Sequence, residues 1–246
     1  MLLKPIFNIV NNLLEAKTGL RIQPSSEYRL GKVRSRVLES QSMDFLIDVG
    51  ANKGQYVERV RKDGYKKIIY SFEPTSNFKI LEETSKRDKN WFVHNLALSN
   101  FEGEMEMNIS SNEGLSSSLL NPKEILNQGF NLGFFQKEKV RVCKLESAID
   151  LPETNNGYLK LDVQGSEMNV LLGGESILSK FKFIEFESAL VQLYEGETTH
   201  YEISEWLIKR GFKPLQLVVT HWDSNEATVS LDAIFEREVK IGRAHV

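Results

Sequence analysis

The sequence predicts an α/β domain: a mostly parallel sheet with helices on both faces and an antiparallel last strand. Along most of the 246 residues, short apolar runs rich in β-prone residues alternate with helical stretches, and the links between them are short. This alternation is typical of a parallel sheet covered on both faces. The last two β-prone runs have no helix between them, which predicts an antiparallel hairpin at one edge of the sheet.

The expected elements follow this pattern in order. Runs such as FLIDV, KIIYSF and FKFIEFE are apolar and rich in β-branched and aromatic residues, as buried strands are. Strands are expected at 45–49, 67–72, 91–95, 158–163, 181–187, 214–220 and 229–235. Helices are expected at 54–62, 75–86, 166–179 and 201–209.

About sixty residues separate the third expected strand from the fourth, an insertion at about 100–150. It contains two strand-like pieces, 104–109 and 139–144, with GLSSSLLNP and the aromatic stretch GFNLGFF between them. Long insertions in compact domains are usually functional, such as a lid or a substrate loop. The serines could hold a sugar or belong to a solvated loop. The aromatic residues could stack on a ligand ring or pack a lid onto the domain; these are Phe130, Phe134 and Phe135.

The two ends of the chain lie outside the main domain, which is predicted at 45–240. Residues 1–44 are expected to form a helical cap, because apolar residues recur at near-helical spacing in MLLKPIFNIVNNLLE. A helix lying on a membrane surface through residues 1–15, or a targeting segment, is the alternative. The ending IGRAHV at 241–246 fits no element and resembles the translation of a sequencing-adapter oligonucleotide, so we expect a non-native tail.

Composition excludes several classes of function. With 31 basic and 34 acidic residues the formal net charge is −3, which disfavours binding to a nucleic-acid backbone. Cys143 is the single cysteine, so an intrachain disulfide and cysteine-based zinc sites are excluded. There is no run of 18 apolar residues, and no membrane-spanning helix is expected. We expect a cytoplasmic protein.

The strongest motif is DVGANKG, from Asp48 to Gly54, between the first strand and the first helix of the sheet. Gly50 and Gly54 permit a tight turn and close approach of a ligand to backbone, and the helix start offers free N–H groups. The motif is neither GxGxxG nor a P-loop. A carboxylate at Asp48 would repel pyrophosphate and attract an ammonium or sulfonium group. The motif therefore favours an amino-acid-bearing nucleoside over a dinucleotide.

Further carboxylates end the neighbouring strands. Glu73 in SFEP ends the second strand and could bind the hydroxyls of an unphosphorylated ribose, although a solvated strand end is the alternative. Asp162 and Glu187 end the fourth and fifth strands, and they converge if these strands are adjacent. They could then act as a general base, a metal pair or hydrogen-bond acceptors for substrate, whereas Glu187 could also be merely exposed. Ser166 could cap the helix that follows.

Together these motifs resemble the FkbM-type S-adenosylmethionine-dependent methyltransferases. The matching segments are IDVGANKGQY, SFEPTSNFKIL, HNLALSN, LKLDVQGSEMNVLLGG, IEFESALVQLYEGE and LDAIFER, and they occur in the family's order from about residue 45 to 237. The resemblance implies a Rossmann-like seven-strand methyltransferase sheet and S-adenosylmethionine as cofactor. It implies three groups of cofactor-binding residues: Asp48, Gly50, Asn52 and Gly54 at the methionine end, Glu73 at the ribose, and Asn95 and Ala97 near the adenine. Asp162 would lie near the transferred methyl group.

The resemblance further implies methylation of a hydroxyl group on a sugar, a polysaccharide or a secondary metabolite. A hydroxyl loses its proton as it is methylated, so a base near the acceptor helps. Asp162 is our first candidate for this base, Glu187 the second and His200 the third. His94 lies inside a strand and is expected to be structural. His221-Trp-Asp223 is expected in a loop near the last hairpin, and no metal site is expected.

Three alternatives stay open at this point. A nicotinamide-dependent oxidoreductase would need the third glycine of GxGxxG and a Tyr-x-x-x-Lys pair, which the sequence lacks. A non-catalytic binding protein on a methyltransferase scaffold is the second alternative, because a fold does not prove activity. A base-flipping nucleic-acid methyltransferase would show an Asn/Asp-Pro-Pro-aromatic motif where DVQG stands. The identity of the acceptor and the oligomeric state are not predicted.

Overall fold

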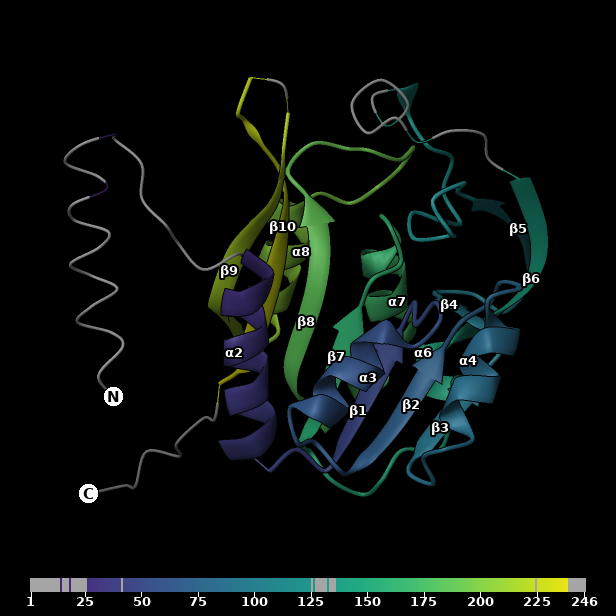
Figure 1. The fold of residues 1–246 in the computed structure, drawn as a ribbon, viewed down its shortest axis with the longest axis vertical. Helices are drawn as coiled ribbons and strands as arrows, with labels where there is room; N and C mark the ends of the chain where they lie inside the picture. The colour runs from purple at the N-terminus through teal and green to yellow at the C-terminus, as the bar shows by residue number, and fades with distance from the viewer. Residues whose placement is uncertain are drawn as a thin grey trace.

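A seven-stranded sheet forms the centre of the molecule (Figure 1). The computed structural model describes residues 26–40, 42–124, 136–223 and 225–238, together with the single residues 14, 18, 126 and 132. The strand order is β3-β2-β1-β7-β8-β10-β9. The strands are β1 (Phe45–Val49), β2 (Ile68–Phe72), β3 (Trp91–His94), β7 (Gly157–Leu161), β8 (Phe181–Ala189), β9 (Phe212–Trp222) and β10 (Thr228–Arg237).

The pairing of these strands confirms the predicted topology. The contacts from β3 through β8 are parallel, and β10 runs antiparallel to both β8 and β9. The final hairpin therefore lies at one edge, with β9 as the outermost strand. The order of the chain reverses between β1 and β7, which is where open α/β sheets bind ligands.

Helices cover both faces of this sheet (Figure 1). On one face, side chains such as Leu46 pack with apolar residues of α2 (Ser26–Ser40), α3 (Gln55–Lys62) and α4 (Phe78–Ser85). On the other, its strand neighbour Ile47 packs with those of α6 (Leu145–Ala148), α7 (Glu167–Gly173) and α8 (His200–Lys209). Successive residues of β1 thus point into opposite cores, and all five residues of this strand are buried.

The prediction of one helix at 166–179 is wrong, because the α-helix found there is shorter. The α-helix ends at Gly173, and a 3₁₀ helix, η1 (Glu175–Lys180), follows Gly174. A Cβ at Gly173 would lie 2.0 Å from the carbonyl oxygen of Ser99, so α7 can approach the backbone at Ser99 this closely only with glycine at position 173. Two consecutive glycines also disfavour helix continuation. Ser166 occupies the N-cap position but makes no capping hydrogen bond with its side chain, contrary to expectation.

The insertion forms a second, three-stranded sheet of order β4-β6-β5, seen beside the main sheet in Figure 1. Its strands are β4 (Ala97–Ser99), β5 (Gly103–Ile109) and β6 (Gln136–Lys144). The two predicted strand-like pieces are confirmed as β5 and β6, whereas β4 was not predicted. The expectations for residues 1–15 apart from Leu14, for Phe130, Phe134 and Phe135, and for 241–246 lie outside the described residues.

None of the helices within the described ranges combines the length and the apolar character that crossing a bilayer requires.

A buried ion pair attaches α2 to the sheet. The guanidinium of Arg34 donates to the carboxylate of Glu185 on β8, with Nε 2.8 Å from Oε2, and both side chains are almost fully buried. The hydroxyls of Tyr56 and Tyr158 donate to the same oxygen, at 2.9 and 2.6 Å. Burial alone would raise the pKa of Glu185, but the charge of Arg34 and these hydrogen bonds hold it below its usual value.

Removing one partner of this pair should strongly destabilise the fold. Arg34→Ala leaves the carboxylate of Glu185 buried without its counter-charge, and we expect a loss of about 3–5 kcal/mol of unfolding free energy. Urea denaturation followed by circular dichroism measures it. The matched control is Lys86→Ala, which breaks the exposed Lys86–Glu83 pair and should leave the unfolding free energy nearly unchanged, because solvent screens exposed pairs. Equal losses in the two variants would contradict the role given to Arg34.

Candidate functional site

A cavity of about 620 Å³ lies at the carboxyl ends of the central strands, beside the reversal between β1 and β7. It is lined by segments that the chain order separates widely: the ends of β1, β2 and β7, the link from β3 to β4, and part of the insertion. Its lining residues are Val49, Gly50, Asn52, Phe72, Glu73, Pro74, Leu96, Ala97, Leu98, Met107, Gly114, Leu115, Ser117, Leu119, Asp162, Val163, Gln164 and Ser166. Four of the residues predicted to bind cofactor are among them, together with Asp162, which was predicted near the transferred methyl group.

The loop after β1 reaches the cavity with its backbone. Gly50 has φ +79°, and a Cβ there would lie 1.8 Å from the carbonyl oxygen of Asp162, so two loops meet at a contact that only glycine permits. Asn52 also lines the cavity. Gly54 does not, which corrects the expectation for this residue. It precedes α3 with φ +96°, and a Cβ there would lie 2.6 Å from the ring of Trp91.

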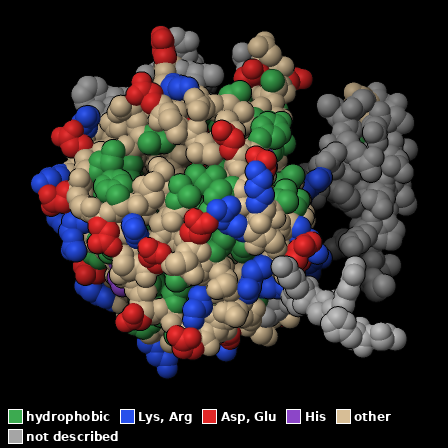
Figure 2. Space-filling view, turned by 180° about the vertical axis from the view of Figure 1, so that it is seen from behind, with side chains coloured by type: hydrophobic (Ala, Val, Ile, Leu, Met, Phe, Trp, Pro, Cys, Tyr) green, Lys and Arg blue, Asp and Glu red, His purple; other side chains and the backbone are tan. Residues whose placement is uncertain are grey.

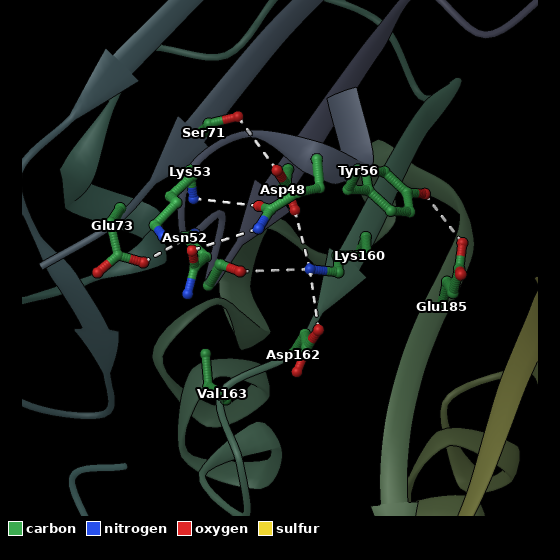
Figure 3. Close-up of polar contacts among 12 residues, drawn as sticks. Asp48, Asn52, Lys53, Tyr56, Ser71, Glu73, Lys160, Asp162, Val163 and Glu185 are labelled. Atoms are coloured by element: carbon green, nitrogen blue, oxygen red, sulfur yellow. Dashed lines mark hydrogen bonds and ion pairs between the residues drawn. The ribbon is translucent and has the colours of Figure 1, made fainter. Parts of the chain in front are cut away.

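Asp48 lies away from the cavity in which it was expected. Its side chain is completely buried and does not line the cavity, because alternation along β1 directs it to the side of α3. Its Oδ1 lies 3.0 Å from Nζ of Lys160, and the hydroxyl of Ser71 donates to Oδ2 at 3.3 Å (Figure 3). Burial raises the pKa of Asp48, and the nearby Lys160 opposes this shift.

Lys160 is a buried side chain of the candidate site that the sequence analysis missed. Its Nζ lies between two carboxylates, 3.0 Å from Asp48 and 3.4 Å from Oδ2 of Asp162 (Figure 3). Burial would lower the pKa of this ammonium, but the two carboxylates raise it above its usual value, so Lys160 is charged. The signal in the sequence is a lysine inside the apolar strand YLKLDV, because a buried charge needs a partner. In the parallel pairing, Lys160 is the neighbour of Asp48.

Glu73 lines the cavity and is almost fully buried. Its Oε2 accepts a hydrogen bond from the backbone N–H of Asn52 at 2.8 Å, and its Oε1 accepts two from Thr75, from N–H at 2.9 Å and from the hydroxyl at 2.5 Å. A carboxylate offers about four acceptor positions, so about one is left for a ligand hydroxyl. Burial raises the pKa of Glu73, and these hydrogen bonds oppose the shift.

Of the two residues predicted near an adenine ring, one lines the cavity and the other does not. Ala97 lines the cavity between Leu96 and Leu98. Asn95 does not line it, which corrects that expectation. The side-chain amide of Asn95 donates to the backbone oxygens of Glu73, at 3.0 Å, and of Pro74, at 3.1 Å. Asn95 therefore fixes the turn that carries Glu73.

Asp162 and Glu187 come together as predicted. Strands β7 and β8 are adjacent, and the amide of Gln164 donates to both carboxylates, at 2.9 Å to Asp162 and 3.4 Å to Glu187. Asp162 lines the first cavity and also a second one of about 710 Å³, whereas Glu187 lines only the second of these two. Asp162 thus lines both cavities. Gln164, which has φ +52°, was not predicted as a site residue.

His200 and His94 pack against aromatic rings of the protein core. The ring of His200 has Nδ1 2.8 Å from the hydroxyl of Ser188 and Nε2 3.2 Å from that of Ser204, it stacks on Phe186, and it lines neither cavity. Burial lowers the pKa of His200. The geometry therefore does not support His200 as a catalytic base. His94 stacks on Phe72 at 5.0 Å between ring centres, in keeping with the expected structural role.

The segment His221–Asp223 was expected to be a loop. His221 and Trp222 instead end strand β9. The carboxylate of Asp223 closes the turn to β10, accepting hydrogen bonds from the backbone N–H groups of Asn225 at 2.8 Å and Ala227 at 2.9 Å.

The serine-rich part of the insertion closes over the first cavity and is not a solvated loop. Ser117 and Ser118 are buried, and the hydroxyl of Ser118 donates to the backbone oxygen of Gln164 at 2.6 Å. Leu115 adds an apolar side chain to the lining. Ser166 also lines this cavity, and its buried hydroxyl has no hydrogen-bond partner among the described residues. An orphaned hydroxyl of this kind favours a ligand that supplies the missing partner.

Comparison with known proteins finds methyltransferases, both among protein families and among curated proteins. Residues 48–214 match the family described as Methyltransferase FkbM domain. A curated protein, 2-O-methyltransferase NoeI from Sinorhizobium fredii (strain NBRC 101917 / NGR234), is 26% identical over 208 residues, which cover 78% of this chain and 82% of that protein.

Solved structures with a similar arrangement are more distant in sequence. The N-methyltransferase NodS from Bradyrhizobium japonicum WM9 has a TM-score of 0.49 and 10% identity, covering 87% of this chain and 97% of that one. An rRNA methylase from Streptococcus thermophilus has a TM-score of 0.49 and 12% identity, covering 89% and 99%.

The buried carboxyl group of Glu167, beside Ser166, should make stability depend on pH. Burial raises the pKa of Glu167 to about 8. Because the folded chain then binds a proton that the unfolded chain has lost, stability should fall as pH rises from near 4.5 to about 8. Glu167→Gln removes this penalty. The stability of the variant relative to the wild type should therefore rise between pH 5 and pH 8 by at least about 1 kcal/mol. This rise corresponds to an advantage of roughly 2–4 °C in Tm for a chain of this size.

Thermal unfolding at the two pH values measures this advantage. Glu58→Gln removes an exposed carboxylate in α3 and controls for the loss of one negative charge. A Glu167→Gln advantage that stays constant or shrinks with rising pH would contradict the assignment.

Proposed function

This chain belongs to the family of the methyltransferase FkbM domain, and from that premise we propose that it transfers a methyl group from S-adenosylmethionine to a hydroxyl group of a small-molecule or carbohydrate acceptor. One observation carries the proposal: two cavities at the carboxyl ends of the strands share a single carboxylate, Asp162. A group in each cavity could meet at this residue. The 2-O-methyltransferase name of the relative supports oxygen as the methylated atom.

The residues of the first cavity fit S-adenosylmethionine. Polar groups and apolar side chains both line it, as small-molecule sites require. The free acceptor position of Glu73 suits a ribose hydroxyl, and the apolar side chains of Ala97 and Leu115 suit the faces of an adenine ring. Gly50 and Asn52 would lie along the methionine end. The orphaned hydroxyl of Ser166 adds a polar atom that nothing in the described chain satisfies.

The chain's own part in the reaction is to orient the acceptor and to take its proton. The bound cofactor supplies an electrophilic methyl group on a sulfonium. Asp162 accepts the proton of the acceptor hydroxyl, and we regard Glu187 as the second candidate for this role. Lys160 and Gln164 position the carboxylate of Asp162 from two sides, at 3.4 Å and 2.9 Å. The buried pair of Lys160 with Asp48 fixes the ammonium, so Asp48 acts as a positioning residue.

The alternatives have less support. A nicotinamide-dependent oxidoreductase does not agree with the family match. A non-catalytic binding protein would not need a carboxylate that lines two cavities. A nucleic acid as acceptor has less support: the net charge is −3, and acidic and basic side chains intermingle on the one face shown in Figure 2.

Ligand binding tests the cofactor assignment. S-adenosylhomocysteine, the demethylated cofactor, should raise the Tm of the full chain, because a ligand that binds only the folded state stabilises it by about 2.7 kcal/mol at 100 times its Kd. The change corresponds to several degrees for a chain of this size. NAD at the same concentration should leave Tm unchanged. Stabilisation by NAD without stabilisation by S-adenosylhomocysteine would contradict the assignment.

A second variant tests the proposed base. Asp162→Asn keeps the size of the side chain but removes its basicity, so kcat should fall by about 10²–10⁴-fold. The Kd of S-adenosylhomocysteine, measured by calorimetry, should change by no more than about threefold, or about 0.7 kcal/mol. Asp150→Asn, at an exposed position outside both cavities, is the matched control and should keep full turnover. Unchanged turnover in Asp162→Asn would remove Asp162 from the role of base.

A further inference from the structure

The link between β8 and α8, residues 190–199, reaches across to the insertion (Figure 1). The backbone N–H of Lys123 donates to the oxygen of Leu193 at 2.9 Å. The backbone N–H of Glu195 donates to the oxygen of Asn121 at 2.8 Å, and the side-chain amide of Asn121 donates back to the carboxylate of Glu195 at 3.1 Å. These four residues lie outside the linings of both cavities, so the insertion is attached to the main sheet at a place away from the ligand.

Tyr194 lies in the middle of this link and is 1% exposed. Its hydroxyl has two acceptors within reach: the backbone oxygen of Ser116 at 3.0 Å and the side-chain oxygen of Gln164 at 3.3 Å. Burial raises the pKa of Tyr194, so the hydroxyl keeps its proton and remains a donor. A single buried hydroxyl therefore joins the insertion to the loop that follows β7.

Both acceptors belong to the wall of the first cavity. Gln164 lines this cavity, and Ser116 stands between Leu115 and Ser117, which line it too. Tyr194 itself lines neither of the two cavities. It therefore holds two separate pieces of the cavity wall together from behind, where it does not touch a ligand.

A second hydroxyl joins the same two segments. Ser118 is completely buried, and its hydroxyl donates to the backbone oxygen of Gln164 at 2.6 Å. The insertion thus meets the loop after β7 through two buried hydrogen-bonding side chains, one from each side. Buried hydrogen bonds are costly to leave unmade, so the two contacts favour the closed arrangement of these segments.

The place of Tyr194 is fixed by its own neighbours. The carboxylate of Glu197 accepts hydrogen bonds from the backbone N–H groups of Leu193, at 2.5 Å, and of Tyr194, at 3.0 Å. Gly165 has φ +95°, and a Cβ there would lie 3.0 Å from Cδ2 of the tyrosine ring, so the loop after β7 lies directly against this ring. Side chains locked in this way are the ones that can hold a binding site in a fixed geometry.

From these contacts we propose that Tyr194 is a positioning residue of the cofactor cavity: its hydroxyl keeps the insertion closed over the first cavity and slows the release of the bound cofactor. For the ligand to leave, the segment around Ser116 moves away from Gln164, and this movement breaks the contacts of Tyr194 and Ser118. The inference rests on the proposed function for the identity of the ligand, and it adds a role for a residue outside the cavity.

The release of S-adenosylhomocysteine from the full chain tests this role without a methyl acceptor. Tyr194→Phe removes the hydroxyl and keeps the ring. We expect the dissociation rate constant to rise by about three- to tenfold, which corresponds to the loss of one buried hydrogen bond. Surface plasmon resonance on the immobilised chain measures it, and binding of S-adenosylhomocysteine also shows that the variant is folded.

Tyr65→Phe is the matched control for the loss of a buried tyrosine hydroxyl. The hydroxyl of Tyr65 donates to the backbone oxygen of Met43 at 3.4 Å, and Tyr65 lines neither of the two cavities. The dissociation rate constant of this variant should stay within about twofold of the wild-type value, even where Tm falls. If Tyr194 only stabilises the fold, Tyr194→Phe will behave like the control, with a lower Tm and an unchanged rate. That result would overturn the inference.

Ser118→Ala tests the closed insertion independently of Tyr194. It removes the other hydroxyl that joins the insertion to Gln164, so the dissociation rate constant should rise in the same direction, by about threefold or more. An unchanged rate in Ser118→Ala would show that the insertion does not open for release, and this result too would overturn the inference.

The outcomes separate the two proposals. If S-adenosylhomocysteine binds the wild-type chain and leaves Tyr194→Phe no faster, the role of Tyr194 is overturned and the proposed cofactor use stands. If S-adenosylhomocysteine does not bind the wild-type chain, the proposed function fails first and the role of Tyr194 fails with it.

Discussion

The polar groups of the candidate site depend on the ion pairs that the buried ammonium of Lys160 makes with two carboxylates. This ammonium lies between a carboxylate that is fully enclosed, Asp48, and one that reaches both cavities, Asp162. Without Lys160, two neighbouring strand ends would carry uncompensated negative charges, one of them in the core, at a cost of several kcal/mol. The parallel register of β1 and β7 makes this arrangement possible, because it pairs Asp48 with Lys160 side by side.

The same two strand ends are held together by backbone packing. The loop after β1 touches the carbonyl oxygen of Asp162 at Gly50, and the next contact runs from the N–H of Asn52 to Glu73. The amide of Asn95 then fixes the backbone of Glu73 and Pro74. Three strand ends therefore form one connected unit, so the positions of the cavity's polar groups are set by the sheet rather than by flexible loops.

The sequence predicted the fold more completely than the site. Strands such as 45–49 and 181–187 carry their own signal in apolar, β-branched runs, and the order of motifs predicted the ends of β1, β2 and β7 as the ligand-binding edge. What it could not supply was the side of the sheet on which each carboxylate lies. Asp48 was predicted to face the ligand as a carboxylate that attracts a cationic group, whereas alternation along β1 turns it toward Lys160. Gly54 and Asn95 were predicted to bind cofactor on the family resemblance, but Gly54 packs close to the ring of Trp91 and Asn95 holds the backbone of Glu73 and Pro74. Such contacts join residues far apart in sequence, and no local pattern records them.

Asp162 lines two cavities whose surroundings differ in chemistry. The first is covered in part by the insertion: Leu115 adds an apolar side chain to its lining, and the hydroxyl of the buried Ser118 ties this segment to the backbone oxygen of Gln164. The second is lined by charged side chains of both signs, and the hydrogen bonds that Gln164 and Thr220 donate to Glu187 there are 3.4 Å long. The chemical difference between the two cavities therefore follows from which elements line them: the insertion on one side, and α2 with the final hairpin on the other.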